Sequence, residues 1–214
     1  MKLTIIYDNT AYKSEFTADW GFSALIEAHG KTILFDTGAS GRILLSNMKK
    51  LGIDPGNIED VFISHGHFDH TGGLSAFLDL NRQVRVWLPC SIRGVKIAKE
   101  VIEVENSLKL FKGLYSTGEL EGIEQSLCVE TQKGIVIIAG CSHPRMETIL
   151  DTASQFGRVY AIIGGLHGTE PKTLENVDLI CATHCTQYKQ ELKALYPKKY
   201  IEGGVGRVIE IEDL

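Results

Sequence analysis

The segment from residue 64 to residue 73 concentrates side chains that bind metal ions. It reads SHGHFDHTGG and places His65, His67, Asp69 and His70 within six residues. In an extended segment His65 and His67 project to the same side, and beyond a bend Asp69 and His70 can turn towards a nearby point. Such a set can serve two neighbouring metal ions. Imidazole nitrogen together with carboxylate oxygen suits Zn²⁺, Fe or Mn²⁺.

The hydrophobic pattern places this segment on a loop at the end of a strand. Residues 61–63 read as a short buried strand, and a polar run follows until helical spacing begins at residue 74. Glycines lie within and after the His-rich run, and they give the backbone the freedom that crowded ligands need. The loop can therefore fold its side chains around an ion.

The rest of the chain reads as strands followed by strand–helix units, an order that is repeated about twice. Strands are predicted at 2–7, 24–28, 31–35, 61–63, 84–88, 127–130, 135–139, 159–163, 179–182 and 208–211, and helices at 40–51, 74–80, 92–99, 146–156 and 187–195. Residues 101–122 show no clear pattern and are the candidate for a lid over the site. The order predicts an α/β fold, an αββα sandwich of two mixed β-sheets flanked by helices.

Composition limits the classes of protein that need to be considered. The 214 residues suit a single domain spanning 1–214, and 43% apolar with 23% charged residues is typical of a globular chain. No stretch approaches the ~20 apolar residues of a membrane span, and no signal peptide is recognisable. A net charge of −5 without a basic cluster argues against nucleic acid, and five cysteines without a framework spacing argue against disulfides. We expect a cytoplasmic protein with a small-molecule partner, and the oligomeric state stays open.

Four motifs carry a resemblance to a known family. The run HGHFDH matches the HxHxDH signature of the metallo-β-lactamase superfamily, and LFDTG around Asp36 resembles the superfamily's first motif. His143 in GCSHP resembles the His of the third motif, and His184 in THCT resembles the His of the last motif. The runs DNT at 8–10 and GFSALIE at 21–27 are similar to the branch named for dihydropterin-ribofuranosylaminobenzene phosphate synthase. The resemblance implies the metallo-β-lactamase fold over the whole chain.

The resemblance also implies a division of ligands between two divalent ions, with zinc preferred and Mn²⁺ or Fe²⁺ as alternatives. One ion would be held by His65, His67 and His143, and the other by Asp69, His70 and His184, with a bridging water between them. Asp36 would accept an N–H from a ligand His, and Asp69 would also hold the attacking water. Asn9 resembles a branch residue near the site opening and is a substrate-binding candidate.

One position departs from the superfamily pattern. Many members carry a bridging Asp after the strand that follows the third motif, whereas here residues 164–168 read GGLHG. His167 either replaces that ligand or acts on the substrate as a proton-transfer residue, with a structural His as the third reading. Cys141 is a possible thiolate ligand, although a small buried residue beside the crowded site is the favoured interpretation.

The function that follows is metal-dependent hydrolysis of a small phosphoester, ester or lactone-like substrate, with Asp69 and His167 as catalytic candidates. The main alternative is a pterin-pathway synthase or transferase that uses the same metal site. A non-catalytic or di-iron redox module is less favoured, because His67 stands where the di-iron branch usually shows Glu.

Overall fold

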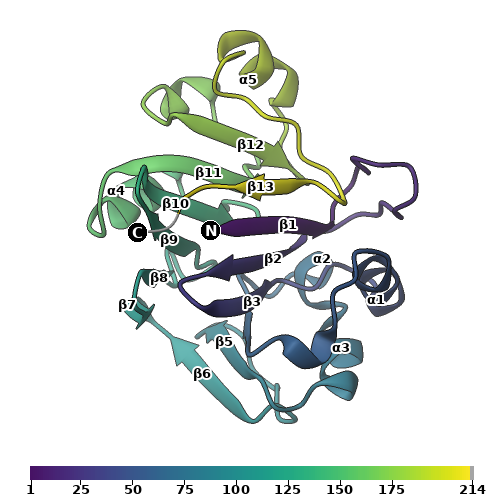
Figure 1. Ribbon diagram of the computed structural model, residues 1–214. Helices are drawn as coiled ribbons and strands as arrows, with labels where there is room; N and C mark the ends of the chain where they lie inside the picture. The colour runs from purple at the N-terminus through teal and green to yellow at the C-terminus, as the bar shows by residue number, and fades with distance from the viewer. Residues whose placement is uncertain (213–214) are drawn as a thin grey trace.

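The computed structural model describes residues 1–212 and contains two mixed β-sheets (Figure 1). The first sheet has the strand order β13-β1-β2-β3-β4-β5-β6, and the second has the order β12-β11-β10-β9-β8-β7. The strands are β1 (Lys2–Tyr7), β2 (Ser23–Ala28), β3 (Lys31–Phe35), β4 (Asp60–Phe62), β5 (Arg85–Pro89), β6 (Glu100–Val104), β7 (Asn106–Phe111), β8 (Leu114–Gly118), β9 (Leu127–Thr131), β10 (Gly134–Ala139), β11 (Val159–Gly165), β12 (Leu179–Thr183) and β13 (Val208–Glu210).

Helices cover the outer face of each sheet. The α-helices are α1 (Gly41–Lys50), α2 (Phe68–Thr71), α3 (Leu74–Leu80), α4 (Met146–Ser154) and α5 (Lys189–Leu195), and short 3₁₀ turns lie at Pro55–Asn57 and Pro171–Leu174. Helices α1 and α3 lie on the first sheet, and α4 and α5 lie on the second (Figure 1). Their apolar side chains pack against the sheets. The predicted αββα sandwich is confirmed. In the described part of the chain every helix is too short or too polar to span a membrane.

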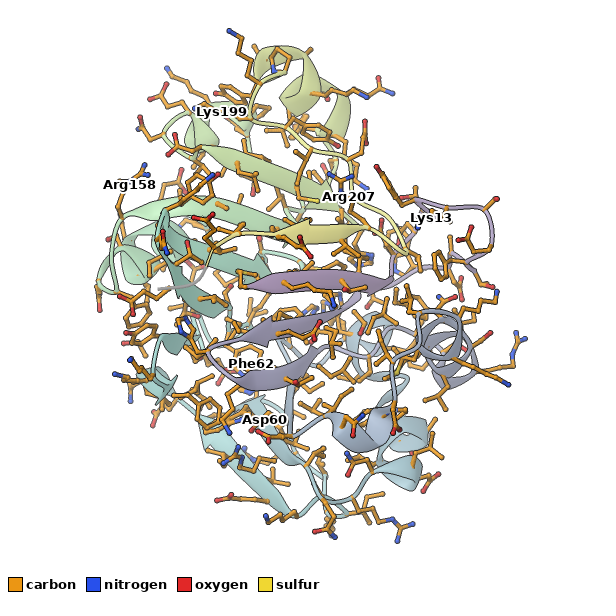
Figure 2. The ribbon with its side chains drawn as sticks, in the orientation of Figure 1. Lys13, Asp60, Phe62, Arg158, Lys199 and Arg207 are labelled. Atoms are coloured by element: carbon orange, nitrogen blue, oxygen red, sulfur yellow. The ribbon has the colours of Figure 1, made fainter. Side chains whose placement is uncertain are left out.

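The inner faces of the two sheets share one apolar core, because alternate residues of a strand point to the same side. Phe35 and Phe62 stack there with their ring centroids 5.5 Å apart. On the same short strand β4, the buried Asp60 carboxylate accepts hydrogen bonds from Arg85 Nε at 2.8 Å and Trp87 Nε1 at 2.9 Å. Figure 2 marks Asp60 and Phe62 on this strand, which leads directly into the His-rich loop.

The loops that bear the predicted site follow the carboxyl ends of parallel strands. Strands β3, β4 and β5 run parallel in the first sheet, and β10, β11 and β12 run parallel in the second. Parallel strands end at the same edge of a sheet, so the loops after them gather in one place. This arrangement brings residues distant in sequence to one end of the sandwich.

Two expectations for residues 92–122 are wrong. The helix predicted at 92–99 is irregular chain, and within it Gly94 has a φ of +96°, which an α-helix does not accept. The candidate lid at 101–122 instead forms β6 to β8, with β6 at the edge of the first sheet and β7 at the edge of the second. The segment thus connects the sheets rather than covering the site.

Candidate metal centre

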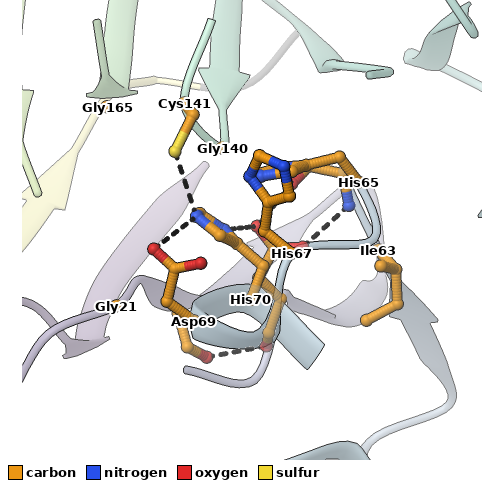
Figure 3. A network of polar contacts seen from close by, with 12 residues as sticks. Gly21, Ile63, His65, His67, Asp69, His70, Gly140, Cys141 and Gly165 are labelled. Carbon is orange, nitrogen blue, oxygen red and sulfur yellow. Dashed lines mark hydrogen bonds and ion pairs between the residues drawn. The ribbon is translucent and has the colours of Figure 1, made fainter. Parts of the chain in front are cut away.

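The structure brings all six predicted ligands together at the carboxyl ends of the strands. Ligand atoms of His65, His67 and His143 lie within 4.8 Å of one another, and so do those of Asp69, His70 and His184. Figure 3 shows His65, His67, Asp69 and His70 gathered around one space below the sulfur of Cys141. The grouping is the one that the resemblance implies, and the role of these residues as ligands stays a prediction.

A short helical turn holds the second half of the His-rich loop. His67 precedes α2, and the carbonyl oxygen of His70 accepts hydrogen bonds from Thr37 N at 2.8 Å and Thr37 Oγ1 at 2.9 Å. The two glycines after α2 are needed for this close approach, since a Cβ at Gly72 would lie 2.3 Å from the Ala39 carbonyl oxygen. The loop is therefore clamped on the chain that follows β3.

In the first sheet, hydrogen bonds fix which nitrogen of each buried His faces the centre. Ser64 Oγ donates to Asp36 Oδ2 at 2.7 Å, so the His65 Nδ1–H donates to Ser64 Oγ at 2.9 Å. His70 Nδ1 donates to Asp36 Oδ2 at 2.7 Å. Both rings then present Nε2, with its lone pair, to the centre.

The second sheet repeats the arrangement with different partners. His143 Nδ1 donates to Glu124 Oε2 at 2.9 Å, and His184 Nδ1 donates to Asn9 Oδ1 at 2.9 Å. Asn9 also donates from Nδ2 to the His184 carbonyl oxygen at 3.1 Å. Four imidazoles are thus held by Nδ1 and offer Nε2, which is the arrangement that orients His ligands on a metal.

Glu124 is a site residue that the sequence reading missed. Its Oε1 accepts backbone N–H groups from Gly140, Cys141 and Ser142 at 2.8–3.1 Å, and its Oε2 accepts from both His143 N and His143 Nδ1. Burial alone would raise the pKa of this carboxyl, yet the bonds from His143 and the neighbouring amides lower it to about 2. Glu124 is therefore an ionised anchor for the loop that carries His143.

Asp36 plays the corresponding part for the His-rich loop. The carboxylate is fully buried and accepts from Ser64 N at 2.7 Å as well as from Ser64 Oγ and His70. Burial raises the pKa of Asp36, and His70 opposes that shift. Burial by itself would lower the pKa of His70, but the Asp36 carboxylate raises it. The pair is a tightly coupled hydrogen-bonded unit behind the centre.

The remaining buried imidazoles are held in the neutral form that binds metals. Burial lowers the pKa of His65 to about 2, and it lowers the pKa of His184 to about 3, in both cases with a further contribution from nearby His70. Within the described residues, His65 Nε2 is buried and has no hydrogen-bond partner. An orphaned buried nitrogen is costly unless something binds it, so the donor set fits a metal ion.

Asp69 is the carboxylate of the second group of predicted ligands. Its Oδ2 lies 3.1 Å from His184 Nε2 and 3.8 Å from His70 Nε2. Burial would raise its pKa, but the nearby His70 and His184 lower it. The exposed Trp20 packs edge-on against His184, with ring centroids 5.0 Å apart, and hydrogen-bonds to Asp69. The rim of the centre is therefore partly aromatic.

His167 lies outside the four clusters of potential ligands in the described chain. Its ring centroid is 5.2 Å from that of His143, and both residues line a cavity of about 330 Å³. The cavity is also lined by Arg145, Thr169 and Thr173. Contact between Cys185 and Cys141 lowers the pKa of the Cys185 thiol, with a further contribution from His167, and raises the pKa of Cys141.

Backbone strain gathers at the same loops. Asp36, Ser142, His167 and His184 have φ values of 41–59°, and they are four of six such non-glycine residues in the part of the chain that the structure describes. Each left-handed non-glycine residue costs of order 1–3 kcal/mol, and such residues persist where surrounding structure imposes them. The concentration of strain marks these strand ends as the functional edge of the sandwich.

The fold and the site together define a hydrolase-like protein with a metallo-β-lactamase fold and a His-rich cluster whose donors fit metal ions. Residues 19–88 match the family model of the metallo-beta-lactamase superfamily. The chain is 29% identical to 7,8-dihydropterin-6-methyl-4-(beta-D-ribofuranosyl)-aminobenzene-5'-phosphate synthase of Methanocaldococcus jannaschii, over 88% of each chain. It also resembles ribonuclease Z of Bacillus cereus, at 29% identity over 56% of this chain and 38% of that one.

A solved structure agrees with this placement. The crystal structure of Tm1679, described as a metal-dependent hydrolase of the beta-lactamase superfamily, superposes with a TM-score of 0.81. The two chains are 27% identical, and the superposition covers 100% of both. The likeness therefore extends over the two sheets and the loops that carry the site.

Proposed function

We propose that the protein is a hydrolase that holds two divalent ions and acts on a small phosphoester, ester or lactone-like substrate. The observation that carries the proposal is the pair of ligand groups, His65 with His67 and His143, and Asp69 with His70 and His184. Each group offers three side chains, which leaves an open position for water or substrate, as in catalytic rather than structural zinc sites.

Zinc is the ion that we propose first. Neutral imidazoles dominate the donor set, since burial lowers the pKa of His65 and of His184 far below neutrality. Imidazole suits zinc and iron, whereas magnesium and calcium prefer sites built from oxygen donors. Manganese and ferrous iron remain the alternatives.

Two residues of the protein would transfer protons: Asp69 would accept one and His167 would donate one. When bound, the ions would lower the pKa of a water molecule and polarise the electrophilic group of the substrate. Asp69 Oδ2, 3.1 Å from His184 Nε2, is placed to orient an attacking water and accept its proton. His167, which is exposed and borders the cavity next to His143, is placed to donate a proton to a leaving group.

The cavity beside the centre limits the substrate to a small molecule. Its volume of about 330 Å³ is at the lower end of ligand pockets, which run from roughly 300 to 1,000 Å³. Arg145 on its wall offers a positive charge that suits a phosphate or carboxylate, although it also pairs with Glu121. The similarity to ribonuclease Z over part of the chain supports phosphoesters as the first class to test.

A pterin-pathway synthase or transferase is the second candidate function. The similarity to the Methanocaldococcus jannaschii synthase over 88% of each chain favours it. The two candidates share the metal site and differ in whether water or an amine attacks the substrate.

The test is a metal analysis joined to a substrate panel. We expect about two transition-metal ions per chain and metal-dependent hydrolysis of at least one member of a panel of phosphomonoesters, phosphodiesters, carboxylic esters and lactones. A chain that holds no metal and takes up neither Zn²⁺ nor Mn²⁺ would contradict the proposal. A fully loaded chain that hydrolyses nothing, but joins the amine of a ribofuranosyl-aminobenzene phosphate to the methyl carbon of a pterin with release of a diphosphate from that carbon, would favour the synthase.

A further inference from the structure

Cys141 lies between the two groups of predicted ligands. Its side chain is buried, and its Sγ is 3.1 Å from His70 Nε2 (Figure 3). The sulfur forms one cluster with His65 and His70, and a second with His184 and Cys185, each with ligand atoms within 4.8 Å. One sulfur atom is therefore close to a predicted ligand of the first ion, His65, and to two predicted ligands of the second, His70 and His184.

The backbone around Cys141 is fixed from two directions. The Cys141 N–H donates to Glu124 Oε1 at 2.8 Å, and the Cys185 thiol donates to the Cys141 carbonyl oxygen at 3.7 Å. The same Glu124 carboxylate holds His143 two residues later. The sulfur and the imidazole of this loop are thus positioned by one anchor, as expected of residues that act on the same centre.

The end of β11 has no room for the carboxylate that many superfamily members use as a bridge. A Cβ at Gly165 would lie 2.4 Å from the Gly140 carbonyl oxygen, 2.8 Å from Cys185 Sγ and 3.2 Å from Cys141 Cα. The loops of Cys141 and Cys185 occupy that space. His167, farther along, belongs to no cluster of potential ligands in the described chain. The Cys141 sulfur is the ligand atom that lies between the two groups of predicted ligands.

We propose that Cys141 Sγ is a metal ligand shared by the two ions, in place of the missing bridging carboxylate, so that water or substrate would take a fifth position on the ions. This inference rests on the proposed metal centre. The thiol would lose its proton to solvent as metal binds, because the thiolate is the ligand form. At a tetrahedral angle, a Zn–N bond of about 2.0 Å and a Zn–S bond of about 2.3 Å place the nitrogen and the sulfur about 3.5 Å apart. The observed separation of 3.1 Å between His70 Nε2 and Cys141 Sγ is close to this distance, so one ion can bind both.

Cys185 is the competing sulfur and is less well placed. It shares a cluster with His184 and Cys141, but with no predicted ligand of the first ion in the described chain. Its thiol is directed at the Cys141 carbonyl oxygen. We assign it a positioning role behind Cys141.

Cobalt substitution separates these assignments without an activity assay. A Co²⁺-loaded chain should show ligand-field bands in the visible range and a thiolate-to-cobalt charge-transfer band in the near ultraviolet. Cys141→Ser should lose the charge-transfer band and keep the ligand-field bands, whereas Cys185→Ser should keep both, and so should the control Cys90→Ser, since Cys90 belongs to no cluster of potential ligands in the described chain. A charge-transfer band that survives Cys141→Ser, or that is absent from the loaded wild type, would overturn the proposal. Absence of all cobalt bands would contradict the metal centre itself.

X-ray absorption of the zinc-loaded wild type provides a second readout that needs no variant. A shared thiolate predicts about one sulfur per zinc at about 2.3 Å. A value near half a sulfur per zinc would overturn the shared position, and a coordination shell of nitrogen and oxygen alone would overturn the ligand assignment altogether.

Discussion

Replacing Glu124 by Gln should lower the affinity of the protein for one metal ion, because it reverses the direction of the hydrogen bond that orients His143. Glu124 Oε2 now accepts from His143 Nδ1 at 2.9 Å. The amide oxygen of the variant would still accept from the three backbone N–H groups that now donate to Glu124 Oε1. Its amide nitrogen would then face His143 and donate to Nδ1. The His143 proton would then move to Nε2, the nitrogen that the centre needs bare.

The magnitude has two parts. Loss of a residue that orients a ligand typically costs 10–100-fold in metal affinity, which is about 1.4–2.7 kcal/mol. In the metal-free protein, the shift of the Glu124 pKa from 4.5 to about 2 is worth on the order of 3 kcal/mol of stability at pH 7. Because the folded-state pKa is depressed, this stability is present above about pH 4.5 and is lost as the pH falls towards about 2.

The assay is competition with a chelator for Zn²⁺, together with urea unfolding of the metal-free protein between pH 7 and pH 3. Glu121→Gln is the matched control, since Glu121 lies on the same loop but pairs with the exposed Arg145 and Thr148. We expect the control to keep the wild-type affinity and pH profile. A Glu124→Gln protein that binds two ions as tightly as the wild type would refute the reasoning.

Three further predictions address the reaction and its pH dependence. Asp69→Ala should abolish hydrolysis and weaken the binding of one ion while circular dichroism stays unchanged, because the side chain is only partly buried and lies outside the apolar cores; activity above about a tenth of wild type would count against its role. His167→Ala should keep the metal content and slow the reaction by roughly 10²–10⁴-fold if it transfers a proton, whereas loss of one ion would make it a ligand. The metal-free protein should lose stability as the pH falls below about 6.5, because His65 and His184 bind protons when unfolded but stay neutral when buried, with folded-state pKa values of about 2 and about 3. These two losses should outweigh the opposite contribution of His70, whose pKa is raised in the folded protein. A melting temperature that does not change between pH 7 and pH 5 would contradict this last prediction.

The His-rich loop was predictable because its ligands are local. His65, His67, Asp69 and His70 lie within six residues, so their spacing alone indicates a metal site. The strand before them is short and fully buried, which also makes the loop easy to place. The hairpin between β2 and β3 was equally clear, since His29 and Gly30 both take positive φ values in its turn.

The residues that hold the ligands were not predictable in the same way. Glu124 lies 19 residues before His143 in a stretch without hydrophobic alternation, and only the fold brings its carboxylate to the loop after β10. Both ends of the Asn9 amide are bonded to His184, which the sequence did not indicate, and a contact of Asn9 with substrate stays a prediction. Partners of this kind come from distant strand ends, and their residue types carry no spacing signal.

The segment from 92 to 122 was misread for a physical reason. Strands β6 and β7 lie at sheet edges, and nearly all of their residues are exposed or only partly buried. An edge strand has one neighbour and little buried surface, so its side chains need not alternate between apolar and polar. The pattern on which strand prediction depends was therefore missing from the segment that connects the two sheets.

The most direct test of the central claim is anomalous X-ray diffraction at the zinc edge from crystals of the zinc-loaded protein. Two anomalous peaks are expected, about 3.5–4 Å apart, one against His65, His67 and His143 and the other against Asp69, His70 and His184. Peaks elsewhere on the surface, or no peak among these six side chains, would contradict the account.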